Sequence, residues 1–342
     1  MMRTIRTIEE LEGRLSEPTD AAVRAMKQID GDLIVLGVAG KMGPTLARMA
    51  VRASERAGVE RRVIGVARFS NVDVQHNLER HGIQTIRCDL LDRAQLDALP
   101  DVPNVVYMAA MKFGATGQEP RAWSMNAYLP GLVCEQFRRS RIVAFSTGNV
   151  YGLVPVAGGG SVEADPLNPA GDYAMSCVGR ERLFEHFSRT LGIPVSIIRL
   201  NYACELRYGV LVDLARKVWE RQTIDLAMGY MNVIWQGDAN AMALASFDNV
   251  ASPPFVLNVT GPEVLRVRDV CEQFARRMNR EPHFIGTESH DALLSNASRA
   301  FELYGRPHVG ADHMIEWTAE WVMSGGATLG KPTHFEVRDG KF

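Results

Sequence analysis

Apolar runs of strand length alternate with helical patterns along the first part of the chain. Residues 33–36 are four consecutive apolar residues, residues 62–70 and 104–110 carry similar runs, and a shorter strand pattern lies at 84–88. Continuous apolar runs are typical of strands that are covered on both faces, as in parallel sheets. Helical patterns, such as the one at residues 93–99, separate these runs. The alternation therefore predicts an α/β fold with a parallel, doubly wound sheet.

A glycine-rich turn follows the first predicted strand. Its glycines have G-x-x-G-x-x-G spacing, and Pro44 then opens a helix-forming run. A turn without Cβ atoms lets the backbone approach a diphosphate, and the helix N-terminus offers it free N–H groups and the positive end of a dipole. The alternative is a tight strand-to-helix turn that binds no ligand. The candidate dinucleotide-binding residues of the turn are Gly37, Gly40, Lys41, Met42 and Gly43.

The end of the second predicted strand bears on the choice between NAD and NADP. A carboxylate at this place would accept hydrogen bonds from the adenosine ribose of NAD, whereas an arginine pairs with the 2′-phosphate of NADP. Ala67 offers no carboxylate, and Arg68 follows it with Ser70 close by. The sequence therefore favours NADP, with NAD as the alternative. Arg68 could otherwise be a solvated loop charge or stack on the adenine.

Composition and charge narrow the class of protein. The chain has 342 residues, of which 46% are hydrophobic and 23% are charged, as in an ordinary globular protein. Its net charge of −2 gives no reason to expect nucleic acid or an anionic membrane as a partner. Five scattered cysteines without a C-x-x-C pair indicate reduced thiols, with neither a disulfide framework nor a metal site. With no apolar run of membrane-spanning length and no signal pattern, the expected location is cytoplasmic.

The pattern divides the chain into four parts. Residues 1–30 hold two short helical patterns and are expected to form a lid on the outer edge of the protein. Residues 31–200 are the predicted dinucleotide-binding domain, and residues 201–325 mainly form a substrate-binding lobe, with some segments returning to the sheet. Residues 326–342 form a tail, in which Phe335 and Phe342 either dock on this subunit or on a neighbouring one, or are disordered.

Several motifs resemble those of the extended short-chain dehydrogenase/reductase superfamily, of the NAD(P)-dependent epimerase/dehydratase type. Five segments carry this resemblance. They are the cofactor turn at 37–43, the adenine-contacting strand end at 88–90, the fourth-strand motif at 108–110, the fifth strand with its active-site loop at 143–152, and the approach to the catalytic tyrosine at 165–173. The resemblance covers roughly residues 31–325. It implies a Rossmann-type sheet with a smaller C-terminal α/β substrate-binding lobe. It also implies further cofactor-binding residues: Asp89, Leu90, Ala109, Ala110 and the supporting Asn126.

The resemblance also implies the catalytic pair. Thr147, next to Ser146, corresponds to the hydroxyl that polarises the substrate oxygen, and Tyr173 to the phenol that moves a proton as hydride passes to or from nicotinamide. Thr147 could otherwise be a strand-end hydroxyl that caps the backbone, and Tyr173 an aromatic ring packed beneath the loop.

The sequence departs from the family one helical turn after Tyr173. The family has a lysine there, which holds the nicotinamide ribose and lowers the pKa of the tyrosine, but this chain has Cys177. Three alternatives follow. Another cation replaces the lysine, with Lys112 the first choice and Arg180 the second; or Tyr173 acts as a neutral acid; or the protein binds a cofactor without turnover. Cys177 as a nucleophile is a further, weaker alternative, because no histidine lies near it in sequence.

A second departure concerns the substrate. Nucleotide-sugar enzymes of this type usually carry a diphosphate-binding arginine at the position of Met231. Arg207 could compensate for its absence or could equally be a surface residue. A small substrate that is not nucleotide-linked is therefore expected. Positional candidates for its pocket are Asn201, Tyr202, Trp235 and Gln236.

The leading functional hypothesis is an oxidoreductase or epimerase/dehydratase, dependent on NADP or NAD, that acts on a small sugar-like, polyol or keto substrate. The alternatives are a dinucleotide-binding regulator or scaffold without dehydrogenase turnover, and a nucleotide-sugar enzyme with a modified site. Members of the resembled family commonly dimerise through the helices that correspond to residues 123–139 and 173–190, so a homodimer is expected.

Overall fold

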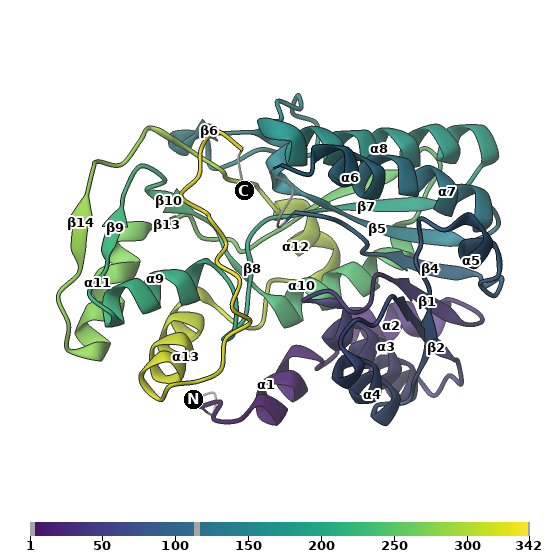
Figure 1. Cartoon of the computed structure of the whole chain (residues 1–342), viewed down its shortest axis with the longest axis horizontal. Helices are drawn as coiled ribbons and strands as arrows, with labels where there is room; N and C mark the ends of the chain where they lie inside the picture. The colour runs from purple at the N-terminus through teal and green to yellow at the C-terminus, as the bar shows by residue number, and fades with distance from the viewer. Residues whose placement is uncertain (1–3, 113–116, 341–342) are drawn as a thin grey trace.

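The centre of the molecule is a single parallel sheet. The computed structural model describes residues 4–112 and 117–340 (Figure 1). Seven strands pair in the order β12-β7-β5-β4-β1-β2-β3, every neighbouring pair being parallel. The prediction of a doubly wound parallel sheet is confirmed, and the strand order reverses between β1 and β4, where such sheets bind ligands. The strands are β1 (Leu33–Leu36), β2 (Val63–Ala67), β3 (Ile83–Arg87), β4 (Asn104–Tyr107), β5 (Arg141–Thr147), β7 (Val195–Leu200) and β12 (Phe255–Val259).

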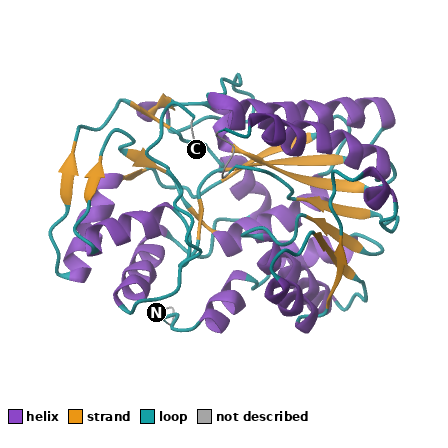
Figure 2. Cartoon of the chain, in the orientation of Figure 1, coloured by secondary structure: helices purple, strands orange, loops and turns teal. Residues whose placement is uncertain are grey.

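Helices cover both faces of this sheet, as Figure 2 shows. Leu33 and Val35 of β1 belong to one core, and Ile34 and Leu36 belong to the other. All four side chains are fully buried, which explains why this strand is a continuous apolar run. The first core is built with α2 (Asp20–Gln28), α3 (Gly43–Ala57), α10 (Gln236–Ala245) and α12 (Ser298–Tyr304), with α4 (Val72–Arg80) beside α3. The second core is built with α5 (Arg93–Asp97), α7 (Leu129–Gln136) and α8 (Gly171–Leu191).

A second lobe with its own hydrophobic core lies beside the sheet, at the left of Figure 1. Its core packs Leu214, Val270 and Trp317 from three helices. These helices are α9 (Val210–Trp219), α11 (Val267–Met278) and α13 (Ala311–Met323). The lobe is completed by pairs of short strands: β8 (Ala203–Cys204) with β11 (Ile234–Trp235), β9 (Thr223–Asp225) with β14 (His283–Ile285), β10 (Tyr230–Met231) with β13 (Leu265–Arg266), and β6 (Val154–Pro155) with β15 (Asp291–Ala292).

The N-terminal segment joins the two cores instead of forming a lid on the outer edge. Its first helix, α1 (Ile8–Leu15), begins with a capping box between Thr7 and Glu10. Leu11 and Leu15 of α1 are buried in the core of the second lobe, whereas α2 packs into the core beneath the sheet. Sequence periodicity marks the apolar face of α1 but does not say which core that face enters.

The C-terminal tail docks on its own subunit. Phe335 is buried in the core of the second lobe, and Thr333 donates hydrogen bonds from N (2.8 Å) and Oγ1 (2.6 Å) to Asp213 Oδ2 on α9. The yellow tail in Figure 1 then runs across the second lobe towards β6. At its end, the backbone of Gly340 lies against Gly171, the first residue of α8. Phe342, the other predicted docking residue, lies outside the described residues.

Two further sequence-based expectations concern cysteines and membrane spans. All five cysteines are buried free thiols, as expected for reduced side chains. Within residues 4–112 and 117–340, no helix is long and apolar enough to cross a membrane.

Candidate functional site

The glycine turn between β1 and α3 is closely packed. Gly37 has a φ of +86°, and a Cβ on it would lie 2.7 Å from the backbone nitrogen of Ala109. A Cβ on Gly43 would lie 2.1 Å from the carbonyl oxygen of Val38. No side chain caps the start of α3, so its first N–H groups point out of the turn without a side-chain acceptor. These features fit the diphosphate of a dinucleotide, which needs close backbone approach and free donors.

Lys41 extends from this turn towards the second lobe. Its Nζ lies 3.3 Å from the ring centroid of Tyr208, which precedes α9. Burial, together with the nearby charges of Lys112 and Lys331, lowers the pKa of Lys41 to about 6. Lys41 of the turn is therefore close enough to Lys112, which follows β4, and to Lys331 of the tail to be affected by their charges.

This pKa predicts proton uptake on dinucleotide binding. With a pKa of about 6, Lys41 is mostly neutral at pH 7; a bound diphosphate favours the charged form and raises the pKa. We expect uptake of up to about one proton per dinucleotide at pH 7, and tighter binding as the pH falls from about 8 to about 6. Calorimetry in two buffers of different ionisation enthalpy measures the uptake. The Lys41→Met variant should lose it, and unchanged uptake in that variant would contradict the assignment.

The residues predicted to contact the adenosine end lie at the carboxyl ends of the next strands. Arg68 and Ser70 are exposed directly after β2, and Phe69 between them is buried with a φ of +47°. A positive φ is strained for a bulky residue, and such strain is common at functional turns. After β3, Asp89 Oδ1 accepts a hydrogen bond from Leu91 N (3.2 Å). Leu90 and Ala109 are buried, whereas Ala110 is exposed.

Thr147 and Tyr173 meet at the carboxyl edge of the sheet. Thr147 ends β5, and its Oγ1 accepts a hydrogen bond from Asn149 N (3.2 Å), so it also caps the following turn. Tyr173 lies in the first turn of α8, and its phenol hydrogen-bonds with the side chains of Thr147 and Cys177. Burial raises the pKa of Tyr173 far above its usual value, although Arg180 and the Thr147 hydrogen bond oppose the rise. The phenol is therefore neutral over the working pH range of most enzymes.

The neighbouring hydroxyl, Ser146, belongs to a different group. Its Oγ donates to Glu181 Oε1, and Glu181 Oε2 pairs with Arg199 Nη2 at 2.7 Å. Arg199 Nη1 also donates to Tyr151 Oη at 2.7 Å. Of the two adjacent hydroxyls, only Thr147 is directed at Tyr173. Sequence reasoning did not identify this buried pair, although Glu181 follows Tyr173 on α8 by two helical turns.

Lys112, the first choice for a replacement cation, does come close to Tyr173. Its Nζ lies over the tyrosine ring, 5.7 Å from the ring centroid. Burial lowers the pKa of Lys112 to about 8, with partial opposition from Cys177. The ammonium group is therefore charged at pH 7 and loses its charge as the pH rises through about 8.

Asn126 ties the end of β4 to α8. It lies in the π-helical turn η1 (Ser124–Tyr128), between α6 (Glu119–Trp123) and α7. Its Oδ1 accepts from Met111 N (2.9 Å) and Arg180 Nη2 (2.8 Å), and its Nδ2 donates to Met111 O (2.9 Å) and Ser176 Oγ (3.0 Å). With its side chain fully buried and bonded to protein groups, Asn126 positions the residues around Tyr173 and does not itself face a cofactor.

Three of the four predicted substrate residues lie in the interior. Asn201 Nδ2 donates to Asn232 Oδ1 (2.9 Å), the ring of Trp235 packs edge-on to Trp317, and Gln236 Nε2 donates to Thr45 Oγ1 (3.1 Å). None of the three is more than 3% exposed. These internal contacts correct the prediction that Asn201, Trp235 and Gln236 line a substrate pocket. Tyr202 is partly exposed and has a φ of +40°.

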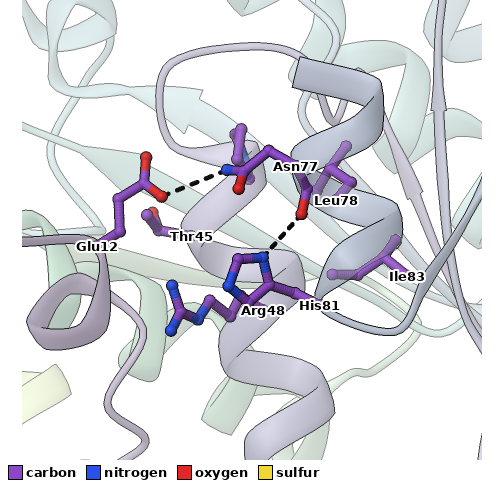
Figure 3. Close-up of a pocket in the computed structure, with 8 residues that line it drawn as sticks. Glu12, Thr45, Arg48, Asn77, Leu78, His81 and Ile83 are labelled. Carbon is purple, nitrogen blue, oxygen red and sulfur yellow. Dashed lines mark hydrogen bonds between the residues drawn. The ribbon is translucent and has the colours of Figure 1, made fainter. Parts of the chain in front are cut away.

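Two surface pockets lie away from the Tyr173 hydroxyl. One, shown in Figure 3, lies between α1, α3 and α4 and has a volume of about 10 Å³, room for about one water. In it Asn77 donates to Glu12 Oε2 (3.3 Å), and His81 Nδ1 contacts Asn77 O (2.7 Å). The other, of about 280 Å³, lies between α9 and the tail and is lined by both signs of charge, including Asp213 and Lys217. Tyr173 and Thr147 line neither pocket.

The class of protein follows from where the glycine turn lies. The glycine turn lies at the point where the parallel sheet reverses its strand order. This arrangement is typical of dinucleotide-binding α/β proteins. The chain belongs to the NAD dependent epimerase/dehydratase family, whose model matches residues 33–204. The resemblance inferred from the motifs is thereby confirmed. No curated protein sequence matches the chain.

Solved structures share this fold at low sequence identity. A mutant of UDP-glucuronic acid 4-epimerase from Bacillus cereus, in complex with a fluorinated UDP-glucuronic acid and NAD, has a TM-score of 0.71 and 19% identity over 86% of this chain and 99% of that chain. The dTDP-glucose 4,6-dehydratase from Bacillus anthracis, in complex with NAD, has a TM-score of 0.73 and 15% identity over 86% and 97%. The UDP-glucose 4-epimerase from Thermotoga maritima has a TM-score of 0.68 and 17% identity over 86% and 99%.

Proposed function

We propose that the protein is an oxidoreductase or epimerase/dehydratase, dependent on NADP or NAD, that acts on a small sugar-like, polyol or keto substrate. The observation that carries this proposal is the meeting of Thr147 and Tyr173 at the carboxyl edge of the sheet, the edge that also holds the glycine turn. A dinucleotide bound there supplies hydride transfer. The family membership and the NAD complexes among the similar structures support an enzyme of this kind.

In this proposal Thr147 and Tyr173 act on the same substrate oxygen in different ways. Thr147 holds the oxygen by a hydrogen bond, and Tyr173 donates its proton to it as a carbonyl becomes an alcohol. In the opposite direction the phenol oxygen accepts that proton. Since burial keeps the phenol neutral, reduction is the direction that the resting protonation state favours.

Two side chains of the second lobe argue against a nucleotide-linked substrate. Met231, at the position of the usual diphosphate-binding arginine, is fully buried in the lobe's core. Arg207 pairs with Glu205 (3.0 Å) and Glu12 (3.1 Å), so two carboxylates already neutralise it. Neither residue offers the free guanidinium that a diphosphate needs.

Turnover assays of the purified protein test the proposal. The panel comprises free sugars, sugar acids and nucleotide sugars with each reduced and oxidised dinucleotide, followed by nicotinamide absorbance and by NMR of the products. Turnover of a free sugar or sugar acid is expected. Turnover confined to nucleotide sugars would overturn the substrate proposal.

Cys177 supports a second candidate, a dinucleotide-binding regulator without turnover. The side chain is fully buried, and burial raises the pKa of its thiol, so Cys177 stays a neutral thiol and cannot supply the positive charge of the family's lysine. Dinucleotide binding without turnover across the panel would favour this candidate. A gain of turnover in the Cys177→Lys variant would then indicate a catalytic site that has lost its cation.

We further propose a preference for NADP over NAD, because Arg68 is exposed at the end of β2. The Arg68→Ala variant should bind NADP roughly 10- to 150-fold more weakly and NAD nearly as well as the wild type, because a phosphate–arginine pair contributes roughly 1.5–3 kcal/mol. Fluorescence titration with each reduced dinucleotide measures both affinities. Arg182→Ala, on the surface of α8, is the control. Tighter binding of NAD than of NADP by the wild type would contradict the preference.

A homodimer remains part of the proposal. Trp123 (38% exposed), Tyr128 (62%) and Met175 (43%) place apolar surface on α6, η1 and α8, the elements expected at the interface. Light scattering across a concentration series measures the mass, and a monomer at all concentrations would contradict the dimer.

A further inference from the structure

Helix α8 carries a buried cation on the same face as Tyr173 and Cys177. Arg180 follows Tyr173 by seven residues and Cys177 by three, so the three side chains share one stripe of the helix. Its residue surface is 3% exposed. A charged group this deep in the protein is costly unless it is compensated.

The hydrogen-bond partners of Arg180 are neutral. Nη1 donates to Phe145 O (2.8 Å), Nη2 to Asn126 Oδ1 (2.8 Å), and Nε to Asn126 O (3.4 Å). The next residue on the helix, Glu181, is held by Arg199 and Ser146. The guanidinium is thus fixed in place by dipoles, while the nearest carboxylate is bound to a different arginine.

Three side chains that interact with the Arg180 charge become negative when they lose a proton. Arg180 interacts electrostatically with Glu181 and with three groups that are neutral while protonated, Cys177, Tyr107 and Tyr173; its Cζ lies 5.8 Å from the ring centroid of Tyr107. Of these three, only Tyr173 also hydrogen-bonds with Thr147 at the carboxyl edge of the sheet. A negative charge on the Tyr173 oxygen would therefore be stabilised by a cation on the same helix stripe, which its hydrogen bonds to Asn126 and Phe145 hold in place.

We infer that Arg180 is a positioning residue that stabilises negative charge on Tyr173, in place of a lysine at position 177. The inference rests on the proposed function, in which Tyr173 gives up its proton. As hydride from the reduced dinucleotide forms a C–H bond at the carbonyl carbon, the carbonyl π bond becomes an electron pair on oxygen. That pair takes the phenol proton, and the O–H electrons remain on Tyr173 as a phenolate, whose charge interacts with that of Arg180.

Lys112 is less suited to this role than the sequence suggested. Its Nζ lies over the face of the Tyr173 ring, and its pKa of about 8 means that the charge is lost in mildly alkaline solution. An arginine keeps its charge at every pH that the protein survives. Arg180 also has three hydrogen bonds that hold its guanidinium plane.

The experiment replaces residue 173 with trifluorotyrosine, whose ring fluorines lower the phenol pKa into an accessible range. Fluorine NMR follows its ionisation in otherwise wild-type protein and in the Arg180→Lys, Arg180→Met, Arg180→Gln and Lys112→Met variants. We expect the phenol pKa to rise by about one unit or more in the Met and Gln variants, and by much less in the Lys variant, which keeps the charge. Lys112→Met should shift the phenol pKa less than Arg180→Met does, because Lys112 loses its charge as the pH rises through about 8.

An equal rise in the Lys, Met and Gln variants would indicate a structural role and overturn the inference, as would no rise in any of them. Arg180→Gln, which retains hydrogen-bonding groups, serves if Arg180→Met does not fold. The titration requires no substrate, so the two proposals can fail separately. A shifted phenol in a protein without turnover overturns the proposed function alone, whereas turnover with an unshifted phenol overturns the role of Arg180.

Discussion

The Tyr173→Phe variant is expected to lose about 10²- to 10⁴-fold in kcat while it binds the dinucleotide as tightly as the wild type, since this is the range that one positioned proton donor contributes. The change removes only the phenol oxygen, which hydrogen-bonds with Thr147 and Cys177. The ring can keep its packing beside Lys112. Steady-state assays with the best substrate of the panel, together with fluorescence titration of the dinucleotide, measure the two quantities.

Tyr128→Phe is the matched control for this change. Tyr128 is 62% exposed on η1, so removing its hydroxyl should leave kcat within about twofold of wild type. A Tyr173→Phe variant that retained full turnover would assign proton transfer to another group. Equal loss of dinucleotide affinity would instead indicate that the phenol holds the cofactor.

The Arg199→Met variant is expected to lose about 3–5 kcal/mol of unfolding free energy, the usual cost of leaving a buried charge without its partner. Arg199 Nη2 lies 2.7 Å from Glu181 Oε2, and the two side chains are only 7% and 6% exposed. The same guanidinium donates to Tyr151 Oη at 2.7 Å and to Glu163 O at 3.1 Å. Urea unfolding followed by tryptophan fluorescence measures the loss.

A surface ion pair on the same helix provides the comparison. Arg182 pairs with Glu185 at 2.8 Å, but its side chain is 63% exposed, so Arg182→Met should cost less than about 1 kcal/mol. Adding Glu181→Gln to Arg199→Met should recover part of the stability, because the unpaired charge is then removed. If Arg199→Met lowered the free energy of unfolding no more than Arg182→Met does, the buried pair would contribute no more to stability than the surface pair.

Local patterns were sufficient for the sheet and the glycine turn. The four residues of β1 face two cores, so each must be apolar, and that requirement is visible in the sequence. A Cβ on Gly43 would meet the backbone of Val38 within the same strand–turn–helix unit. A Cβ on Gly37 would meet the backbone of Ala109, which follows the adjacent strand β4. The steric need for glycine is therefore local at Gly43, whereas at Gly37 it depends on the adjacent strand β4.

Contacts between distant segments account for what the sequence did not reveal. Gln236 is polar and follows a predicted pocket residue, yet its amide donates to Thr45, 191 residues earlier, in the interior. Trp235 packs on Trp317 in the same way. The burial of Arg180 depends on Asn126 and Phe145 from two other elements. In the sequence, only the seven-residue spacing of Arg180 from Tyr173 indicated that the two side chains are neighbours.

The place of α1 makes the two lobes interdependent during synthesis. Leu11 and Leu15 are translated before Trp317 and Phe335, but all four side chains are buried in the same core. During synthesis, the apolar face of α1 therefore stays uncovered until Trp317 and Phe335 have been translated. A fragment that contained the second lobe alone would lack these two side chains and expose the surface they cover. The core of the second lobe is therefore complete only when the N-terminal segment is present.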